Sequence, residues 1–552
     1  MQENVATVLE TVAGLRGDAP ALRQGEDVRG WSELDERASR LAAHLAAGGI
    51  GPESRVAIGM YNRIAYVESV LAILKLRAVP VNVNYRYREE ELRFLLDDAG
   101  AEGMVLGPEL AERTAACLPA LPRLRTLVQT PPLPGEPDAE PPPGAVPYAD
   151  ALRAAPLPYA DRGDDHWLLY TGGTTGNPKG VLARHSWLFG VCAANGYRLL
   201  GRTPPASLDE VRTAVAEPAA DGPPLTTLVV SPLMHGTGIY NTLGSLLVGG
   251  TVVLTESRGF DPAEAAGLAI GLGVTDFILV GDVFARPLAD ELDRAEAAGE
   301  PHAMPRLRRM SSVGVTWSAE VKARLLRHGD FVCRDIIAAS EGGPFAIAET
   351  RRGETAVTSR FVLFPGARVI DSEGDDVVPG SGVPGLLAAP TDAETGYQGD
   401  DAKTAQTFRM IGGRRFCVPG DMATLEPDGT LTLLGRGSRV INTGGEKVFA
   451  EEVEQRVLEH PAVRDAVVVG VPDERFGHRV VAVVVPEPGA SLTEAELREH
   501  VGAALADYKR PRGLVLVPEV RRSPVGKADL GWAVQAATET GAAPDRSSAP
   551  TT

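Results

Sequence analysis

Cysteine and long hydrophobic runs are scarce in this 552-residue sequence, and each scarcity argues against a class of protein. The four cysteines (Cys117, Cys192, Cys333 and Cys417) lie far apart, without a Cys-x-x-Cys pair, which argues against a disulfide scaffold or a zinc finger. The nine histidines are scattered, so no zinc site is predicted. No hydrophobic run reaches the length of a membrane-spanning helix, and the N-terminus has no basic segment followed by an apolar one. We therefore expect a cytoplasmic protein without stable membrane association.

The sequence also has fewer positively charged residues than negatively charged ones. The chain has 55 lysines and arginines against 73 aspartates and glutamates, a net charge of −18. This balance argues against nucleic acid or an anionic membrane as the main partner. It does not exclude an anionic ligand, because the N–H groups of a single loop create a local positive field. The chain is too long for one simple core, so we expect at least two domains.

Patterns typical of strands and of helices alternate in the first half of the chain. Residues 31–48 and 67–76 have apolar positions at helical spacing. Runs typical of buried strands occur at 55–59, 78–84, 227–231, 251–254 and 276–280. This alternation predicts βαβ units on a parallel sheet, and thus an α/β fold with a large N-terminal lobe.

The pattern changes after residue 435. A helix is predicted at 450–460, strands at 466–471, 480–485 and 514–517, and a further helix with a Thr493/Glu496 capping box. We therefore predict a large N-terminal domain at 1–436 and a small, mobile α+β domain at 437–533. The polar residues 534–552 are predicted to be a disordered tail.

A loop rich in glycine and threonine, residues 170–180 (YTGGTTGNPKG), follows a predicted buried strand at 167–170. Glycines let backbone N–H groups approach a bulky anion, threonine hydroxyls add donors, and Lys179 adds a compact positive charge. The loop has neither the spacing of a Walker A motif nor that of the dinucleotide fingerprint. An ordinary strand-to-helix turn is the alternative, but this composition favours phosphate binding.

The loop resembles the phosphate-binding signature of the adenylate-forming (ANL) superfamily, which contains acyl-CoA synthetases, luciferases and peptide-synthetase adenylation domains. Other stretches match this superfamily in the same order over nearly the whole chain. Gly172 is a mild departure, because the usual residue there is Ser or Thr. The resemblance implies an ATP- or AMP-binding set of Thr171, Gly173, Thr174, Thr175, Gly176, Lys179, Gly314, Val315, Ala338, Ala339, Ser340, Asp421 and Arg436.

Two of the matching stretches resemble segments that contact adenine and bind a metal ion in the superfamily. Residues 311–316 (SSVGVT) resemble the turn that lies against adenine, and residues 337–343 (IAASEGG) resemble the Tyr-Gly-x-Thr-Glu motif. By resemblance, Glu341 and Thr171 are the expected Mg²⁺ ligands, and a carboxylate suits that hard cation. Ile337 and Ala338 replace the usual Tyr-Gly, so aromatic stacking on adenine is not expected.

Further matches assign the acid and ribose sites. Residues 231–238 (SPLMHGTG) resemble the wall of the acyl pocket, which implies a substrate pocket of His235, Gly236 and Gly314. His235 replaces the aspartate that holds an amine in amino-acid-activating relatives, which argues against an amino-acid substrate. A buried, hydrogen-bonded core histidine is the alternative interpretation. Asp421 and Arg436 resemble the pair of residues that binds the ribose of the nucleotide.

The last matches lie in the small domain. Residues 440–454 resemble the loop that enters the active site for the thiol step, which implies a CoA channel of Gly444, Gly445, Glu446 and Lys447. Arg439 occupies the position of the hinge. Residues 523–527 (SPVGK) resemble the motif whose lysine reaches the ATP site. The implied catalytic set is therefore Lys527, Glu341, Thr174 and Lys179.

The resemblance implies an AMP-forming acid:CoA ligase that uses ATP, Mg²⁺ and CoA. It implies a hydrophobic acid, and a bulky terpenoid or steroid acid of an actinobacterial pathway is one hypothesis. Three alternatives stay open: a ligase that stops at the adenylate or loads a carrier-protein thiol, a luciferase-like oxygenase, and an inactive nucleotide-binding protein. A homodimer is compatible with each of these interpretations.

Overall fold

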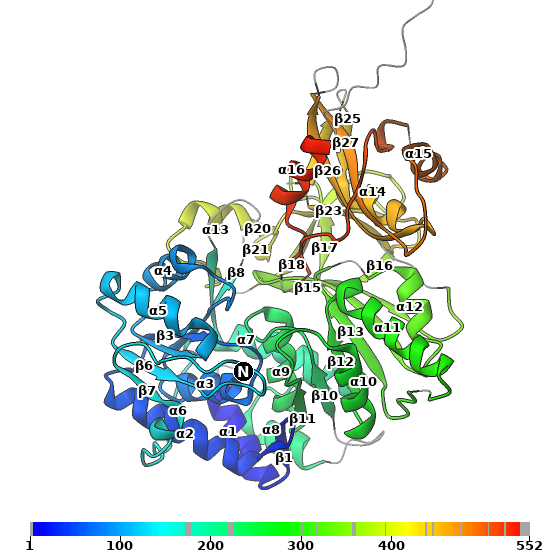
Figure 1. Cartoon of the computed structure of the whole chain (residues 1–552). Helices are drawn as coiled ribbons and strands as arrows, with labels where there is room; N and C mark the ends of the chain where they lie inside the picture. The colour runs from blue at the N-terminus through cyan, green and yellow to red at the C-terminus, as the bar shows by residue number, and fades with distance from the viewer. Residues whose placement is uncertain are drawn as a thin grey trace, which may run out of the picture.

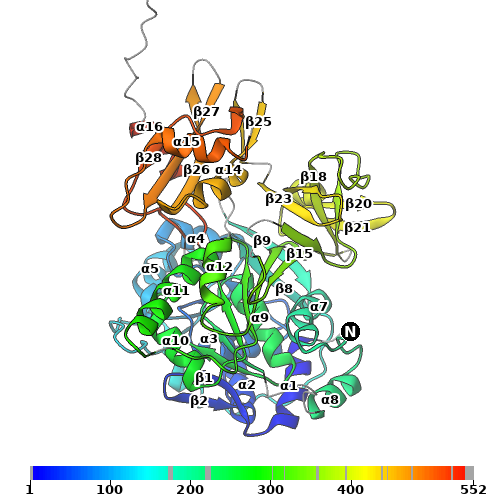
Figure 2. The same ribbon diagram turned by 90° about the vertical axis from the view of Figure 1, so that its right-hand side faces the viewer.

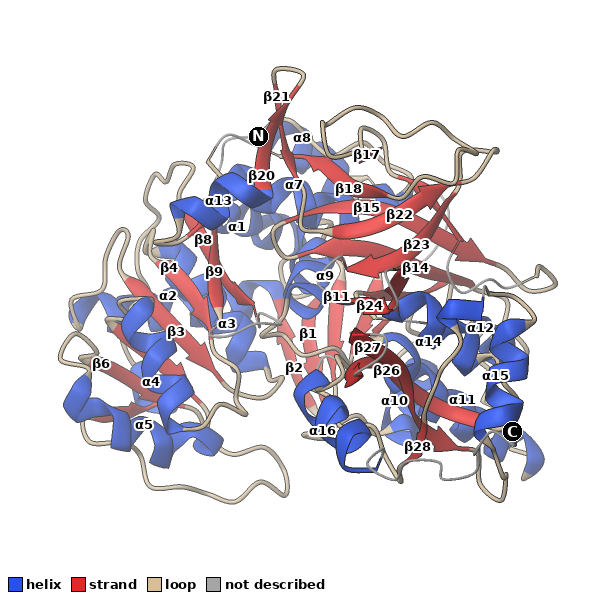
Figure 3. Ribbon diagram, turned by 90° about the horizontal axis from the view of Figure 1, so that it is seen from above, coloured by secondary structure: helices blue, strands red, loops and turns tan. Residues whose placement is uncertain are grey.

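The computed structural model describes residues 4–171, 178–217, 225–300, 302–315, 317–355, 360–391, 394–436, 439–443, 446–473, 477–505, 507–523 and 526–540. Within these residues the strands form three sheets (Figures 1 and 3). Two sheets and their helices make a large body. The third sheet and the last helices, orange to red in Figures 1 and 2, form a smaller unit on top of it.

The first sheet has eight strands, most of which run parallel. Its strands β3, β4, β5, β6 and β7 run parallel, and β8 joins parallel to β4. Strands β9 and β19 complete it with antiparallel pairs at one edge. In spatial order the strands are β19 (Gly396–Tyr397), β9 (Lys179–Arg184), β8 (His166–Thr171), β4 (Val79–Asn82), β3 (Arg55–Gly59), β5 (Gly103–Leu106), β6 (Thr126–Gln129) and β7 (Ala145–Pro147).

The second sheet is larger and changes character along its width. It is parallel from β1 to β14 and antiparallel from β14 onward. In spatial order its strands are β2 (Asp27–Gly30), β1 (Pro20–Gln24), β11 (Thr251–Leu254), β10 (Thr226–Val229), β12 (Asp276–Leu279), β13 (Arg309–Val313), β14 (Val332–Ala339), β15 (Gly342–Thr350), β16 (Arg360–Leu363), β23 (Leu431–Arg436), β22 (Asp421–Leu425), β18 (Gly385–Pro390), β21 (Arg414–Cys417) and β20 (Phe408–Ile411), with β17 (Arg368–Ile370) paired to β18.

Helices cover both faces of the two sheets because successive strand residues point to opposite sides. In β10, for example, Leu228 joins the core on one face and Val229 the core on the other. Helices between the two sheets are α1 (Val5–Arg16), α2 (Trp31–Ala47), α3 (Ile64–Lys75), α7 (His185–Gly196) and α9 (Gly236–Leu247). The outer faces are covered by α4 (Glu89–Asp98) and α5 (Ala111–Cys117) on one side, and by α10 (Pro262–Gly271), α11 (Gly281–Ala297) and α12 (Ala319–Leu325) on the other. Shorter helices are α6 (Tyr148–Ala151), α8 (Leu208–Ala216) and α13 (Asp401–Thr407).

The smaller unit has a five-stranded sheet with its own cores. Val453 and Val457 of α14 are fully buried against this sheet, as their helical spacing predicts. The capping box of Thr493 and Glu496 is present at the start of α15. The elements are β24 (Val440–Thr443), β25 (Glu446–Phe449), β26 (Val463–Asp473), β27 (Gly477–Pro486), β28 (Leu514–Leu516), α14 (Ala450–Leu458), α15 (Glu494–Gly502) and α16 (Leu530–Thr540).

The predicted α/β fold with a small α+β unit is confirmed, and one prediction about its ends is wrong. Residues 534–540 are not a disordered tail but belong to α16. Ala533 and Ala537 of this helix are fully buried against β26 and β27. The rest of the predicted tail, residues 541–552, lies outside the described residues.

The buried His185 at the start of α7 makes the stability of the large body depend on pH. Its Nδ1 accepts a hydrogen bond from the Val5 N–H at 3.1 Å, and burial lowers its pKa to about 4. The unfolded chain takes up this proton near pH 6.5. The free energy of unfolding should therefore fall by at most about 1.4 kcal/mol per pH unit as the pH drops from about 6.5 to 4.

Thermal unfolding at pH 7 and pH 5 tests this expectation. His185→Asn keeps an acceptor close to the Nδ1 position and removes the titrating group. We expect a smaller drop in melting temperature between the two pH values for this variant than for the wild type. An equal drop in both proteins would show that His185 is not responsible.

Candidate active site

Thr171 and Lys179 lie opposite each other at the end of the β8–β9 hairpin where the connecting loop begins and ends. The two strands pair antiparallel, with Thr171 facing Lys179 in the register. The Lys179 Nζ donates a hydrogen bond to the Asp400 carboxylate at 2.6 Å, and both side chains are partly exposed. Such an exposed pair is weak, so the ammonium of Lys179 can exchange its partner at little cost. The loop's other predicted residues (Gly173, Thr174, Thr175 and Gly176) lie outside the described residues.

Asn82, at the end of β4, connects this hairpin to the segment before His235. Its side-chain oxygen accepts a hydrogen bond from the Tyr170 N–H at 2.6 Å, and its amide donates to the Tyr170 carbonyl at 2.8 Å. The same amide donates to the Met234 carbonyl at 2.7 Å. Asn82 therefore fixes the start of the loop and the residue before His235 in one network. The sequence offered no signal for this role.

Asn62 holds the same segment from a second point. Its amide donates to the Ser231 carbonyl at 3.0 Å, and its oxygen accepts the Leu233 N–H at 2.8 Å. Two asparagines thus hold the predicted acyl wall by its backbone.

His235 precedes the first residue of α9 and presents an unused ring nitrogen. Its Nε2 is buried and has no hydrogen-bond partner among the described residues. Burial lowers the pKa of His235 to about 3, and the positive charge of Lys527 acts in the same direction. Gly236 follows it, and a Cβ there would lie 3.0 Å from the Tyr240 ring. The wall therefore contains a neutral histidine and leaves no room for a larger residue beside it.

Glu341 lies in the turn between β14 and β15, next to Ser340. Its carboxylate accepts a hydrogen bond from the Tyr397 hydroxyl at 2.6 Å. Among the described residues, no lysine or arginine forms an ion pair with it. Tyr240 belongs to α9, and its pKa is raised mainly by burial. The negative charge of Glu341 contributes a smaller part of this rise, so the Glu341 carboxylate lies near α9. A half-buried carboxylate without a cationic partner fits a divalent cation.

The remaining nucleotide residues lie along neighbouring strands of the second sheet. Ala338 and Ala339 end β14. Gly314 follows β13 with a φ of +89°, in the region that favours glycine, and Val315 comes directly after it. Asp421 and Arg436 face each other across the β22–β23 pair, although the side chain of Arg436 is not described.

The end of the smaller unit reaches into this site. Gly526 lies against α11, where a Cβ on it would come within 3.0 Å of the Val283 side chain. Lys527 follows and is close enough for its charge to act on His235. The Arg464 guanidinium of the smaller unit pairs with Asp290 of α11 at 2.9 Å. The smaller unit therefore packs against α11, and the charge of Lys527 acts on His235 of the predicted acyl wall.

Arg439 marks the passage from the large body to the smaller unit. Strand β23 ends in the second sheet at Arg436, and β24 begins in the third sheet at Val440. The Arg439 guanidinium pairs with Glu454 at 2.6 Å and with Glu451 at 3.1 Å. Both partners belong to α14, so the side chain of Arg439 is held by the smaller unit.

The predicted CoA channel is only partly described. Gly444 and Gly445 lie outside the described residues. Glu446 and Lys447 begin β25, and their side chains are not described. These four residues stay a prediction.

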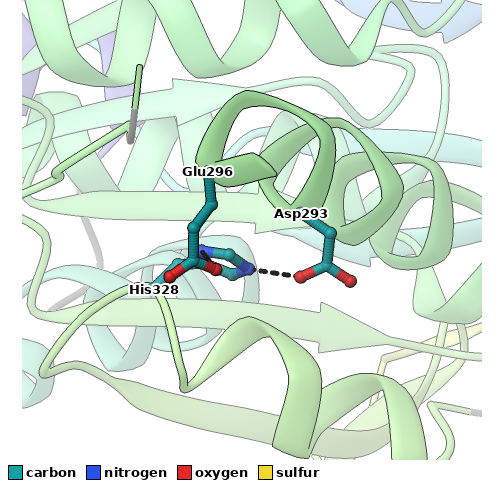
Figure 4. Close-up of side chains that lie close together, drawn as sticks. All are labelled: Asp293, Glu296 and His328. Carbon is teal, nitrogen blue, oxygen red and sulfur yellow. Dashed lines mark hydrogen bonds and ion pairs between the residues drawn. The ribbon is translucent and has the colours of Figure 1, made fainter. Parts of the chain in front are cut away.

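A second group of metal-ligand types lies away from these residues (Figure 4). Ligand atoms of Asp293, Glu296 and His328 lie within 4.8 Å of one another. Asp293, however, pairs with Arg324 at 2.8 Å as well as with His328 at 2.7 Å. Despite burial, hydrogen bonds from Arg324 and His328 lower the pKa of Asp293 to about 2. Arg324 already neutralises Asp293, so this group is an ion-pair cluster between α11 and the α12 region rather than a metal site.

Comparisons with known proteins agree with this geometry. The profile of the AMP-binding enzyme family matches residues 9–390, and that of the AMP-binding enzyme C-terminal domain matches residues 452–527. A medium/long-chain-fatty-acid–CoA/3-oxocholest-4-en-26-oate–CoA ligase of Mycolicibacterium smegmatis is 38% identical over 541 residues, covering 97% of this chain and 96% of the relative. A 3-oxocholest-4-en-26-oate–CoA ligase of Rhodococcus rhodochrous is 37% identical over 541 residues, covering 97% and 96%.

The fold is shared with solved structures at much lower identity. The anthranilate CoA ligase AuaEII, solved with anthranoyl-AMP, superposes with a TM-score of 0.80 at 21% identity, covering 98% of each chain. None of the described helices has the length and apolar character required to cross a membrane. The chain belongs to the AMP-binding enzyme family, as its resemblance to adenylate-forming enzymes implied.

Proposed function

We propose that this protein is an AMP-forming acid:CoA ligase for a hydrophobic carboxylic acid. In the first step, a carboxylate oxygen attacks the α-phosphorus of ATP, the bond to the bridging oxygen breaks, and pyrophosphate leaves. In the second, the sulfur of CoA attacks the acyl carbonyl, and AMP leaves. The observations that support the proposal are the packing of Gly526, from the small unit, against α11 and the action of the neighbouring Lys527 charge on His235 of the predicted acyl wall.

The first step brings negative charge together, and residues of this chain can offset that charge. Lys179 lies at the phosphate loop in a weak exposed pair, from which a phosphate can recruit it. Lys527 supplies a second ammonium, from the small unit. A Mg²⁺ ion bound to Glu341 and Thr171 would offset further phosphate charge. Positioning and electrostatics supply the catalysis, so no covalent enzyme nucleophile is needed.

The neutral state of His235 suits an acyl substrate. Since its pKa is lowered to about 3, the ring carries no charge near neutral pH. A neutral imidazole with a free nitrogen can exchange a hydrogen bond with the substrate, and it offers no anion for the amine of an amino acid. This favours acids of the kind named for the relatives, medium- and long-chain fatty acids and steroid side-chain acids.

The thioester step requires Lys527 to leave. In the proposed cycle, the small domain at 437–533 rotates about Arg439 relative to the large domain at 1–436. The ion pairs of Arg439 with Glu451 and Glu454 would move with the small domain. Residues 444–447 would then come to the thiol channel. A cytoplasmic location and a homodimer remain predictions, and size-exclusion chromatography tests the second.

A screen of acids by pyrophosphate release tests the proposed function. The panel should contain medium- and long-chain fatty acids, 3-oxocholest-4-en-26-oate and an aryl acid, each with and without CoA. We expect ATP consumption with a hydrophobic acid and an acyl-CoA product by mass spectrometry. ATP consumption without a thioester would favour the adenylate-only or carrier-protein alternative, and light with CO₂ the oxygenase. If no acid led to ATP consumption, the proposal would be wrong.

The ion pair between Arg464 and Asp290 should favour the orientation that forms the adenylate. Its nitrogen–oxygen distance is 2.9 Å, but both side chains are about 40% exposed, so it contributes at most about 1 kcal/mol. We expect Arg464→Asp to slow adenylate formation a few-fold, without slowing acyl transfer from added adenylate to CoA. Combining Arg464→Asp with Asp290→Arg should restore part of the rate. Equal slowing of both steps would argue against an effect on domain orientation.

A further inference from the structure

Tyr397 touches two of the groups proposed to handle ATP. Its hydroxyl donates to the Oε1 of Glu341 at 2.6 Å. The face of its ring lies 5.9 Å from the Nζ of Lys179, within range of a cation–π interaction. Three residues later, Asp400 pairs with the same ammonium at 2.6 Å. One short segment therefore contacts both the candidate metal ligand and the phosphate-loop lysine.

The backbone of Tyr397 is held in place from two sides. In the short strand β19 it pairs with Val181 of β9, the strand that begins at Lys179. Its N–H donates to the Thr404 hydroxyl at 2.9 Å. Both contacts are local to the hairpin that carries Lys179 and to helix α13. The position of the ring is therefore tied to the phosphate loop itself.

The side chain is equally constrained. Tyr397 is only 9% exposed, and its ring packs edge-on against Phe408 at 6.0 Å between centroids. The geometry of its hydroxyl, 2.6 Å from the Oε1 of Glu341, makes it a donor to this carboxylate. A fixed donor on one carboxylate oxygen leaves the other oxygen of Glu341 for a ligand and restricts its orientation.

We propose that Tyr397 is a positioning residue that holds Glu341 and Lys179 in the geometry required for Mg·ATP. This inference rests on the proposed function. Tyr397 does not contact the reacting atoms in this assignment; it orders the groups that do. Because a hydrogen bond to a charged group is stronger than a neutral one, its loss should weaken metal binding about tenfold.

The direct test is metal binding without turnover. Mn²⁺ binding is measured by electron paramagnetic resonance in the presence of a non-hydrolysable ATP analogue. Tyr397→Phe keeps the ring and removes the hydroxyl, and we expect about tenfold weaker Mn²⁺ binding. Tyr397→Leu also removes the ring face next to Lys179, so we expect it to weaken binding of the analogue further.

A matched control separates this role from general stability. The hydroxyl of Tyr148, another buried tyrosine, donates to the buried Glu68 in the large body, remote from the site. Tyr148→Phe should bind Mn²⁺ and the analogue like the wild type. In steady-state kinetics, Tyr397→Phe should raise the KM for Mg·ATP and leave the transfer from added adenylate to CoA unchanged.

A double-variant comparison links the effect to Glu341. Adding Tyr397→Phe to Glu341→Ala should cause no further loss of Mn²⁺ affinity, because in Glu341→Ala the hydroxyl of Tyr397 has no carboxylate left to position. Unchanged Mn²⁺ binding in Tyr397→Phe, or losses that simply add in the double variant, would overturn the inference. If the wild type formed no adenylate, the proposed function would fail, but the Mn²⁺ titration would still decide the role of Tyr397.

Discussion

Replacement of Lys527 by alanine is expected to slow adenylate formation about a hundred- to a thousandfold. The reason is electrostatic: Lys527 brings an ammonium to the acyl wall, where the negative charges of the acid and the α-phosphate meet. A positive charge that is held where negative charge develops stabilises the transition state. Transfer of the acyl group from added adenylate to CoA should continue at close to the wild-type rate, because in the proposed cycle Lys527 leaves the site before this step.

The two half-reactions are measured separately. Pyrophosphate release in the presence of acid and ATP reports the first, and acyl-CoA formation from synthetic adenylate reports the second. Arg456→Ala is a suitable control, because it removes one positive charge from the surface of the same unit, in a pair with Glu459. A comparable loss in both half-reactions of Lys527→Ala would contradict the assignment of two domain orientations.

Local patterns predicted the elements of this fold well. The helix of Val453 and Val457, the capping box of Thr493 and the buried strands of the parallel sheet all depend on residues close in sequence. The wrong prediction of a tail from residue 534 has a local cause too. Ala533 and Ala537 have helical spacing, but an alanine-rich polar segment is also typical of disorder, and only the sheet that buries them decides between the two.

The residues that position the candidate site could not be predicted in this way. Asn82 bonds to Tyr170 and Met234, which are 88 and 152 residues away. Tyr397 bonds to Glu341 across 56 residues, from a strand of only two residues. A single amide or phenol carries no periodic signal, and its partners are chosen by the packing of two sheets. The sequence therefore predicted the groups that are proposed to face ATP, but not the groups that hold them in place.

A change of Glu341 to glutamine should have the second large effect. The amide keeps the size of the side chain but loses the charge that makes Glu341 a suitable Mg²⁺ ligand. We expect a drop in the rate of adenylate formation of about a hundredfold at limiting Mg²⁺, partly recovered at high Mg²⁺. The hydrogen bond from Tyr397 can still form to the amide oxygen, so the turn itself should keep its structure.

The measurement is the rate of pyrophosphate release over a range of Mg²⁺ concentrations at fixed ATP. Glu349→Gln is the matched control, since Glu349 lies on the same hairpin but is exposed and pairs with Arg334 at 3.0 Å. This control should show the wild-type dependence on Mg²⁺. An unchanged dependence in Glu341→Gln would remove Glu341 from the metal site. It would then leave Lys179 and Lys527 as the groups that offset the charge of the triphosphate.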